Sequence, residues 1–348
     1  MDLTWQLLVG LSVDGRDVSG LFRPALSSVT VTDAAGVEAD ELTVVLSGGP
    51  RWAPVAEPDP GVELEVRLGI PGAPLGTFTV DETTISDAPA ALEISAAGAA
   101  FMSPRDGRSP LTTAKTRSWA KGTKLADMVA KIASEHGLQP VIGKSLEAVV
   151  LPHIDQRAES DIALLTRVAR DHDAFAKPAS GRLVVARRGE GKTATGASMP
   201  VLRLVRTDVS SWSRSRSEPE GTGEVIAVWR NRAAAADVEV KVGSGEPVRR
   251  LRQVFPDEAS AKAAAEAERA RAVRAKEALT FRMPGRLDVV AEALVVALDW
   301  HPSLAGRLWV ITKAVHRVDA SGWGVTVTAE PASDHAGANP SGVGQDGG

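Results

Sequence analysis

GTFTVDETTISDAPAALEISA, residues 76 to 96, alternates apolar with polar side chains on both sides of a short turn. This period of two is the pattern of a strand that buries one face, and Ser, Asp and Pro between two such runs favour a hairpin. Residues 306 to 329, GRLWVITKAVHRVDASGWGVTVTA, show the same arrangement, with Val310 placed like Val80, four residues after the first Gly. The spacing leaves two interpretations open, a duplicated β module and two unrelated hairpins.

Further β-rich segments surround these hairpins, separated by stretches dense in Gly, Pro, Asp and Ala. Before residue 100 they lie at 26–33, 40–47, 62–70 and 92–98. After residue 200 they lie at 201–209, 223–231 and 237–243. Many short strands at such spacing indicate a closed antiparallel barrel or a sandwich. We therefore expect an α+β protein, mainly β, with two antiparallel β-barrel domains and an inserted small α+β domain.

Three segments have the helical period instead. From residue 123 apolar side chains recur at three- and four-residue steps, and we expect Thr123 to cap this helix and Gly137 to end it. A second helix is predicted over about 161–172. A third, near 256–277, is rich in alanine and other good helix formers.

The composition shifts along the chain predict four units. Residues 1–100 form the first β-barrel domain, and residues 101–190 form the α+β domain. Residues 191–333 form the second β-barrel domain, which contains the third helix. Residues 334–348 are Gly-rich and weakly apolar, so we expect a flexible tail.

Composition excludes several functions. The 348 residues are 43% hydrophobic and 24% charged, which is ordinary for a globular protein. The net charge of -4 gives no basic field for nucleic acid, and we predict no nucleic-acid sequence recognition. The absence of cysteine removes disulfides and thiol chemistry. No leader or long apolar run is present, so we expect neither export nor stable membrane insertion.

HIDQRAESD, residues 153 to 161, gathers titratable side chains just before the second helix. His153, Asp155 and Glu159 suggest a metal site, but zinc needs three or four ligands in defined geometry and no second histidine cluster accompanies them. A structural explanation fits better: Ser160 is placed to cap the helix, and the acids beside it favour the positive end of the helix dipole. We predict no catalytic, cofactor or metal residues here.

Two other motifs suggest a ligand. ARRGEGKT, residues 186 to 193, has Ala186 where a phosphate-binding loop requires glycine, and no helical pattern follows. RLVRTDVSSWSRSRS, residues 203 to 217, is basic but short and is flanked by acidic residues. A solvated turn explains the first motif and a solvated edge or loop explains the second, so no cofactor is predicted.

The same region carries a family resemblance. HGL at 136 to 138 and the stretch from 154 to 189 resemble the phage late-control gene D family, the baseplate hub proteins of contractile phage tails, related to the N-terminal hub region of type VI secretion spike proteins. The pattern Q-x-x-E-S-D-x-x-x-L-x-R-x-A is carried by Gln156, Glu159, Ser160, Asp161, Leu165, Arg167 and Ala169. The chain departs from the family in having no tyrosine after the second helix, where His172 to Phe175 stand.

The resemblance implies a homotrimer in which two similar barrels per subunit form a pseudo-sixfold ring. This ring joins the sixfold tail tube protein to a threefold tail spike or tip protein, with tape measure and baseplate wedge proteins as further partners. It places the protein in the baseplate of a virion or tailocin assembled in the host cytoplasm, without enzymatic activity. It also favours the duplicated module.

Two other functions stay open on sequence alone. One is a tail-associated cell-wall hydrolase that uses an acid pair such as Asp155 and Glu159, because such enzymes need only two suitably placed carboxyl groups. The other is a monomeric binding module with a β-barrel recognition face.

Overall fold

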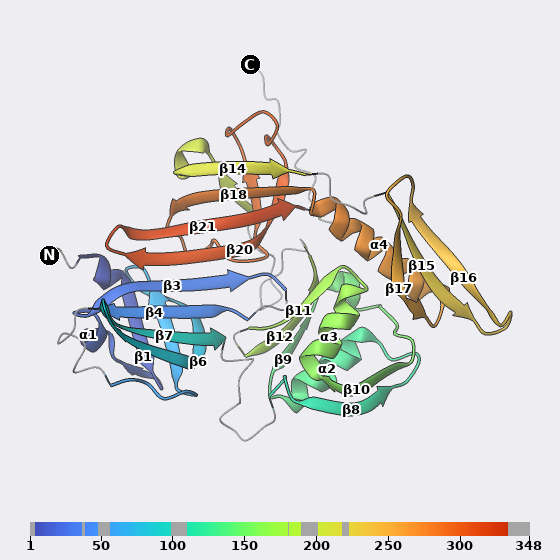
Figure 1. The fold of residues 1–348 in the computed structure, drawn as a ribbon, viewed down its shortest axis with the longest axis horizontal. Coiled ribbons are helices and arrows are strands. Elements are labelled where there is room, and N and C mark those ends of the chain that lie inside the picture. Colours follow the sequence, from blue (N-terminus) through green and yellow to red (C-terminus); the bar gives the residue numbers. More distant parts are fainter. Residues whose placement is uncertain are drawn as a thin grey trace, which may run out of the picture.

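The computed structural model describes residues 4–36, 39–47, 56–98, 110–179, 181–188, 201–217 and 223–332. The predicted tail at 334–348 lies outside these ranges. Strands dominate the described residues, which confirms the α+β, mainly β class (Figure 1). No helix within these ranges is long and apolar enough to cross a membrane.

The N-terminal part of the chain forms a module of antiparallel strands. In order of pairing these are β3 (Leu26–Ala34), β4 (Glu41–Ser47), β7 (Ala90–Gly98), β6 (Ala73–Asp87), β5 (Glu63–Leu68), β1 (Val9–Val13) and β2 (Arg16–Asp17). The short helices η1 (Thr4–Leu8) and α1 (Ser19–Phe22) flank β1 and β2 in the chain. Alternate side chains enter the core, as on β4, where Leu42, Val44 and Leu46 are at most 1% exposed. The strands predicted before residue 100 are confirmed.

The C-terminal part forms a second module. Its strands, in order of pairing, are β14 (Ser211–Arg216), β18 (Glu277–Pro284), β21 (Gly322–Pro331), β20 (Leu308–Asp319), β19 (Leu294–Ala297) and β13 (Val201–Leu204), and the short helix η5 (Arg206–Asp208) follows β13. This module has its own core around Trp309, Phe281 and Trp300, whose apolar rings are buried together.

The two modules share one sheet, and neither closes into a barrel by strand pairing within the described residues. Residues Lys313–Asp319 of β20 pair antiparallel with β3, so thirteen strands form one sheet. Eleven of them follow one path from β14 to β2, and β19 and β13 branch from β20. In Figure 1 the strands from β14 down to β7 follow one another in this order. The expectation of closed barrels was wrong because β3 pairs with the other module instead of closing its own.

The two modules repeat one pattern of strands. The order β3-β4-β7-β6-β5 corresponds to β14-β18-β21-β20-β19. Each long strand breaks register with its hairpin partner at one place, between Val80 and Glu82 on β6 and between Ile311 and Lys313 on β20. The order diverges only beyond β5 and β19, since β1 pairs antiparallel with β5 while β13 pairs parallel with β19. The shared order and the shared bulge indicate a duplicated module.

An α+β unit lies between the modules in the chain. It contains β8 (Ala114–Trp119), α2 (Leu125–Glu135), β9 (Gln139–Ile142), η4 (Lys144–Leu146), β10 (Ile154–Ser160), α3 (Asp161–Arg170), β11 (Ala174–Ala179) and β12 (Arg182–Arg187). Strand β10 pairs with β8, and β11, β12 and β9 form a second small sheet. The predicted apolar faces of both helices are buried in one core. The expected cap at Thr123 was wrong, because Lys124 occupies the cap position and the Thr123 hydroxyl donates to the Ala120 carbonyl.

A separate three-stranded sheet precedes the last part of the second module. It consists of β16 (Ala236–Gly243), β15 (Glu224–Asn231) and β17 (Arg249–Phe255), and one face packs on α4 (Glu258–Arg274). Helix α4 begins at Asp257, whose carboxylate accepts from the Ser260 N–H at 2.9 Å. Small alanines such as Ala261, Ala264 and Ala265 let the helix approach the strands closely. This unit projects to the right of the molecule in Figure 1.

Candidate functional site

The family-motif residues lie where β10 passes into α3. The Ser160 hydroxyl accepts from the Ala163 N–H at 3.3 Å, so the predicted helix cap is confirmed. Just before it, β10 breaks register with β8 between Gln156 and Glu159, and Ala158 has φ of 48°. This bulge brings Gln156 and Asp161 to hydrogen-bond distance on the inner side of the joint.

Asp161 is the centre of a buried polar cluster, which we call the Asp161 cluster. Its side chain is fully buried, and one oxygen accepts from Arg117 at 2.5 Å and from Gln156 at 2.8 Å. The other oxygen accepts from Lys115 at 2.6 Å and bonds the His136 ring at 2.8 Å. Burial alone would raise the pKa of Asp161, but hydrogen bonds from Lys115, His136 and Gln156 outweigh it and lower the pKa to about 2.

Glu135 completes this cluster at the end of α2. Lys115 donates to it at 2.9 Å, and Arg117 donates to its two oxygens at 2.7 and 2.8 Å. Burial acts to raise the pKa of Glu135, yet these bonds lower it overall. Ligand atoms of Glu135, His136 and Asp161 lie within 4.8 Å of one another, close enough to hold a metal ion. Because two cationic side chains already occupy both carboxylates, the arrangement is that of an ion-pair cluster.

The remaining motif residues support the same joint. Arg167 on α3 forms a two-point ion pair with Glu159, at 3.0 and 2.8 Å, and also donates to the Asp155 carbonyl at 3.3 Å. Leu165 and Ala169 are each 1% exposed and pack in the core of the α+β unit. The motif therefore fixes the strand–helix joint against β8 and α2.

Asp155, one of the two acids considered for a hydrolase, lacks the electrostatics of a general acid. A general acid needs a carboxyl group with a raised pKa. A hydrogen bond from Arg157, together with one to His153 at 3.1 Å, outweighs the effect of burial and lowers the pKa of Asp155. Glu159 is held in the ion pair with Arg167. The structure thus does not combine His153, Asp155 and Glu159 into one site.

The other two motifs that suggested a ligand lie at the end of a strand and at the edge of the large sheet. Residues 186–188 end β12 and the turn after it, and the rest of ARRGEGKT lies outside the described ranges. The basic stretch 203–217 runs from β13 through η5 into β14, where Arg214 and Arg216 lie on the edge strand of the large sheet. The predicted solvated edge is therefore confirmed.

Two buried junctions that tie the units together were not predicted. In the first, the Lys177 junction, the ammonium of Lys177 on β11 donates to Asp33 at 2.8 Å, to Asp40 at 2.6 Å and to the Ala34 carbonyl at 2.7 Å. The second oxygen of Asp33 accepts from the Ala291 N–H of the second module at 2.8 Å. One carboxylate thus connects three parts of the chain.

The second, the Arg274 junction, lies at the end of α4. Arg274 is 3% exposed and bonds both oxygens of Asp173, at 2.7 and 2.5 Å. Its third donor reaches Glu330 on β21 at 3.1 Å. This guanidinium connects α4 to the α+β unit and to the second module, and all three of its bonds are to carboxylates.

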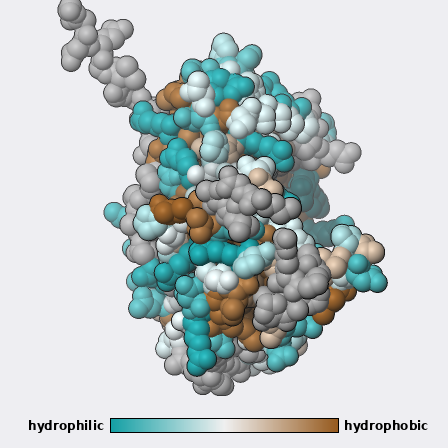
Figure 2. Space-filling view, turned by 90° about the vertical axis from the view of Figure 1, so that its left-hand side faces the viewer, coloured by the Kyte–Doolittle hydropathy of each residue, from teal (hydrophilic) through white to brown (hydrophobic). Residues whose placement is uncertain are grey.

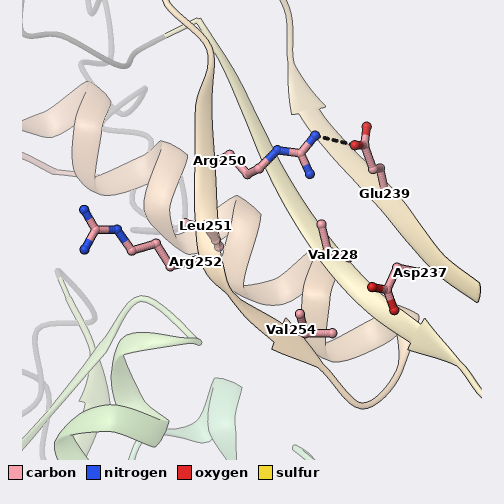
Figure 3. Close-up of a pocket in the computed structure, with 7 residues that line it drawn as sticks. All are labelled: Val228, Asp237, Glu239, Arg250, Leu251, Arg252 and Val254. Carbon is pink, nitrogen blue, oxygen red and sulfur yellow. Dashed lines mark hydrogen bonds and ion pairs between the residues drawn. The ribbon is translucent and has the colours of Figure 1, made fainter.

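Two surface cavities accompany α4 and its sheet. One, of about 410 Å³, lies on the open face of the sheet, where Arg250 pairs with Glu239 beside Val228 and Val254 (Figure 3). The other, of about 340 Å³, separates the sheet from the α+β unit and is lined partly by Asp171 and His172. Burial raises the pKa of Asp171 to about 6 and lowers that of His172 to about 4.

Apolar and polar side chains are interspersed over one face of the molecule. On the side of the molecule shown in Figure 2, hydrophobic residues form separate patches between hydrophilic ones. The polar clusters connect parts of the fold to one another, and their charged groups are paired.

Comparison with known proteins identifies the family. The model of the phage tail baseplate hub (GPD) family matches residues 100–322, which include the Asp161 cluster and α4. The chain therefore belongs to the phage tail baseplate hub family, as its motif predicts. A probable baseplate hub protein of Escherichia phage P2 is 28% identical over 364 residues, covering 92% of each chain. A structural role in the tail baseplate follows.

Solved structures share the fold. The tail protein from Neisseria meningitidis MC58 has a TM-score of 0.69 at 17% identity, covering 94% of this chain and 97% of that one. The E. coli c3393 protein, a component of the type VI secretion system with structural similarity to phage T4 tail proteins, has a TM-score of 0.60 at 13% identity. That match covers 94% of this chain and 78% of the other.

Proposed function

We propose that this chain assembles as a homotrimer that adapts a sixfold tail tube to a threefold spike, in the baseplate of a contractile phage tail or a tailocin. The observation that carries the proposal is the repeated module. Three chains, each with two modules of the same strand order, present six similar units on one side and three chains on the other.

The buried junctions suit this mechanical role. The Lys177 junction and the Arg274 junction attach the α+β unit to both modules, so that force applied to one part passes to the others. Tail tube and spike proteins are the direct partners, and tape measure and baseplate wedge proteins are further ones. Assembly takes place in the host cytoplasm before the particle is complete.

In this proposal three units have separate tasks. The modules at 1–100 and 191–333 form the ring, and the unit at 101–190 braces it. No unit carries a catalytic function.

Mass in solution tests the proposal. Light scattering of the purified full chain is expected to give the mass of three subunits. Mixed with a candidate spike protein, the chain is expected to give the mass of three subunits plus the bound spike. The same preparation is expected to leave peptidoglycan uncleaved, and the Asp155→Asn/Glu159→Gln variant is expected to behave identically. A stable monomer in every mixture, or peptidoglycan cleavage that this variant abolishes, contradicts the hub function.

A further inference from the structure

A groove separates the α+β unit from α4 and its sheet. It consists of one cavity of about 340 Å³ and an adjoining one of about 230 Å³, which share the lining residues Leu151, Pro152, His172 and Ser260. One wall is formed by the end of β17 and the start of α4, and the other by residues 150–155 and the end of α3. None of the described residues that line the groove belongs to the large sheet, so the groove is separate from both β modules.

The groove has apolar side chains on its floor and at its rim. On the floor, Leu151, Val168 and Phe255 are at most 3% exposed. At the rim, Val150 on one wall is 60% exposed and Val254 on the other is 52% exposed. A ligand with apolar side chains removes both valines from water at once, which favours its binding.

Two polar side chains line the groove without a partner. Asp171 and His172 directly follow α3 and are half-buried. Within the described residues, neither side chain has a hydrogen bond or a direct ion pair. Burial lowers the pKa of His172 to about 4, so its ring is neutral and can donate one hydrogen bond. A carboxylate that accepts and a ring N–H that donates match the N–H and C=O groups of a peptide backbone.

Two cations at the mouth of the groove select the charge of a ligand. Lys121 lines the smaller cavity, and Arg232, in the turn between β15 and β16, lines the larger one. Both are exposed, and within the described residues neither has an ion-pair partner. Of the acids that line the groove, Asp155 pairs with Arg157 and Asp257 caps α4. Acidic side chains on the ligand therefore complement the mouth.

We propose that this groove binds a short extended peptide segment of a partner protein, in which apolar residues alternate with acidic ones. Successive side chains of an extended segment point to opposite sides, so the apolar ones enter the groove between Val150 and Val254 while the acidic ones face its mouth. The backbone donates an N–H to the Asp171 carboxylate and accepts from the His172 ring. This binding site goes beyond the hub function and does not depend on the trimer.

A synthetic peptide tests the chemistry of the ligand. The probe is a fluorescein-labelled peptide of the sequence Gly-Glu-Val-Glu-Val-Glu-Gly, and fluorescence anisotropy with the purified full chain measures its dissociation constant. Saturable binding is expected. A peptide with lysine in place of each glutamate, and one with serine in place of each valine, are each expected to bind at least about tenfold more weakly.

Charge reversal in the protein tests the place of binding. Arg232→Glu is expected to raise the dissociation constant of the acidic peptide at least about tenfold, because like charges then meet at the mouth. The same variant is expected to bind the lysine peptide more tightly than the unchanged protein does. Arg282→Glu, at an exposed position on β18, makes the same charge change on the large sheet and is expected to leave both affinities unchanged.

The pH dependence of binding tests the hydrogen bond to Asp171. Burial raises the pKa of Asp171 to about 6. Charged or titratable groups act on it or line the same cavity from α3, α4, β10 and β15, namely Arg167, Arg170, Arg271, His153, Asp155, Arg230 and His172. A peptide N–H bonds the ionised carboxylate, so the affinity is expected to fall as pH falls through about 6.

The sign of this dependence identifies the group. Protonation of His153 would strengthen the binding of an acidic peptide, which is the opposite direction. Asp171→Asn is expected to bind the peptide more weakly at neutral pH and to lose the fall in affinity below it. An affinity that falls in the same way in Asp171→Asn excludes the bond to Asp171 and overturns the proposed binding mode.

The outcomes separate this inference from the proposed function. No change in anisotropy at any soluble peptide concentration, or equal affinity for the acidic and lysine peptides, overturns the peptide site. Binding that disappears as the chain assembles also overturns it, because a second copy then covers the groove. All these results leave the mass by light scattering, and with it the hub function, untouched.

Discussion

The Asp161 cluster and the Lys177 junction are both buried networks of acids and cations, but their charge balance differs. In the Asp161 cluster, Asp161 and Glu135 meet two cations, Lys115 and Arg117. In the Lys177 junction, Asp33 and Asp40 share one ammonium. Burial and the charge of Asp33 raise the pKa of Asp40 to about 7, while that of Asp161 falls to about 2. The balance of acids and cations in each network, rather than burial alone, decides whether the pKa of the buried carboxyl group rises or falls.

The difference separates two structural roles. The balanced cluster lies inside the α+β unit and holds β8, α2 and α3 together at all ordinary pH values. The junction with excess acid lies between units, where protonation of Asp40 near neutral pH changes its charge. Removing single groups from each network sharpens the comparison.

The largest effect is expected for Asp161→Asn. The substitution leaves Lys115 and Arg117 facing an amide that cannot balance them, which costs about 3 kcal/mol of unfolding free energy. Urea unfolding followed by tryptophan fluorescence measures this loss. The control is Asp155→Asn, an exposed acid on β10, the strand that precedes α3, which is expected to leave the unfolding midpoint unchanged. Equal midpoints for the two variants would show that the cluster contributes no stability.

A smaller, pH-dependent effect is expected for Lys177→Met. At pH 8 the variant buries Asp33 and Asp40 without their cation, at a cost of about 2 kcal/mol, reduced because both acids keep some contact with solvent. At pH 5 the cost is expected to be smaller, since Asp40 is then protonated. Unfolding curves at the two pH values measure the difference, and an identical cost at both would be inconsistent with a raised pKa of Asp40.

The smallest effect concerns how the free energy of unfolding depends on pH. The folded-state pKa of Asp40 lies above its unfolded value, so the folded state binds more protons between pH 4 and 7, and stability falls as pH rises through this window. Asp40→Asn is expected to remove about 1 kcal/mol of this fall between pH 6 and pH 7. Asp161 acts oppositely, because its lowered pKa contributes stability that is lost only as pH falls from about 4 towards 2. If the unfolding free energy of Asp40→Asn depended on pH in the same way as that of the unchanged protein, the raised pKa of Asp40 would be refuted.

Local features of the fold could be read from the sequence, because their causes lie within a few residues. Ser160 caps α3 through a contact three residues away, and Asp257 caps α4 in the same way. Alternation predicted most strands, since each side chain's face depends on its neighbours. The basic edge strand β14 was likewise visible as a polar stretch that no core could bury.

Contacts between distant parts of the chain could not be predicted in this way. Asp161 was expected only at the helix start, but its cations stand 44 and 46 residues earlier. Lys177 and Asp33 are 144 residues apart, and no local pattern joins them. The expectation of closed barrels failed for the same reason. Alternation predicts that a segment is a strand, but it does not predict that β3 pairs with β20.

Electron microscopy of the purified chain bound to a spike protein tests the central claim most directly. We expect a threefold ring of six similar β modules. Particles that contain one chain per spike subunit without contacts between modules, or a ring with a different number of modules, would contradict it.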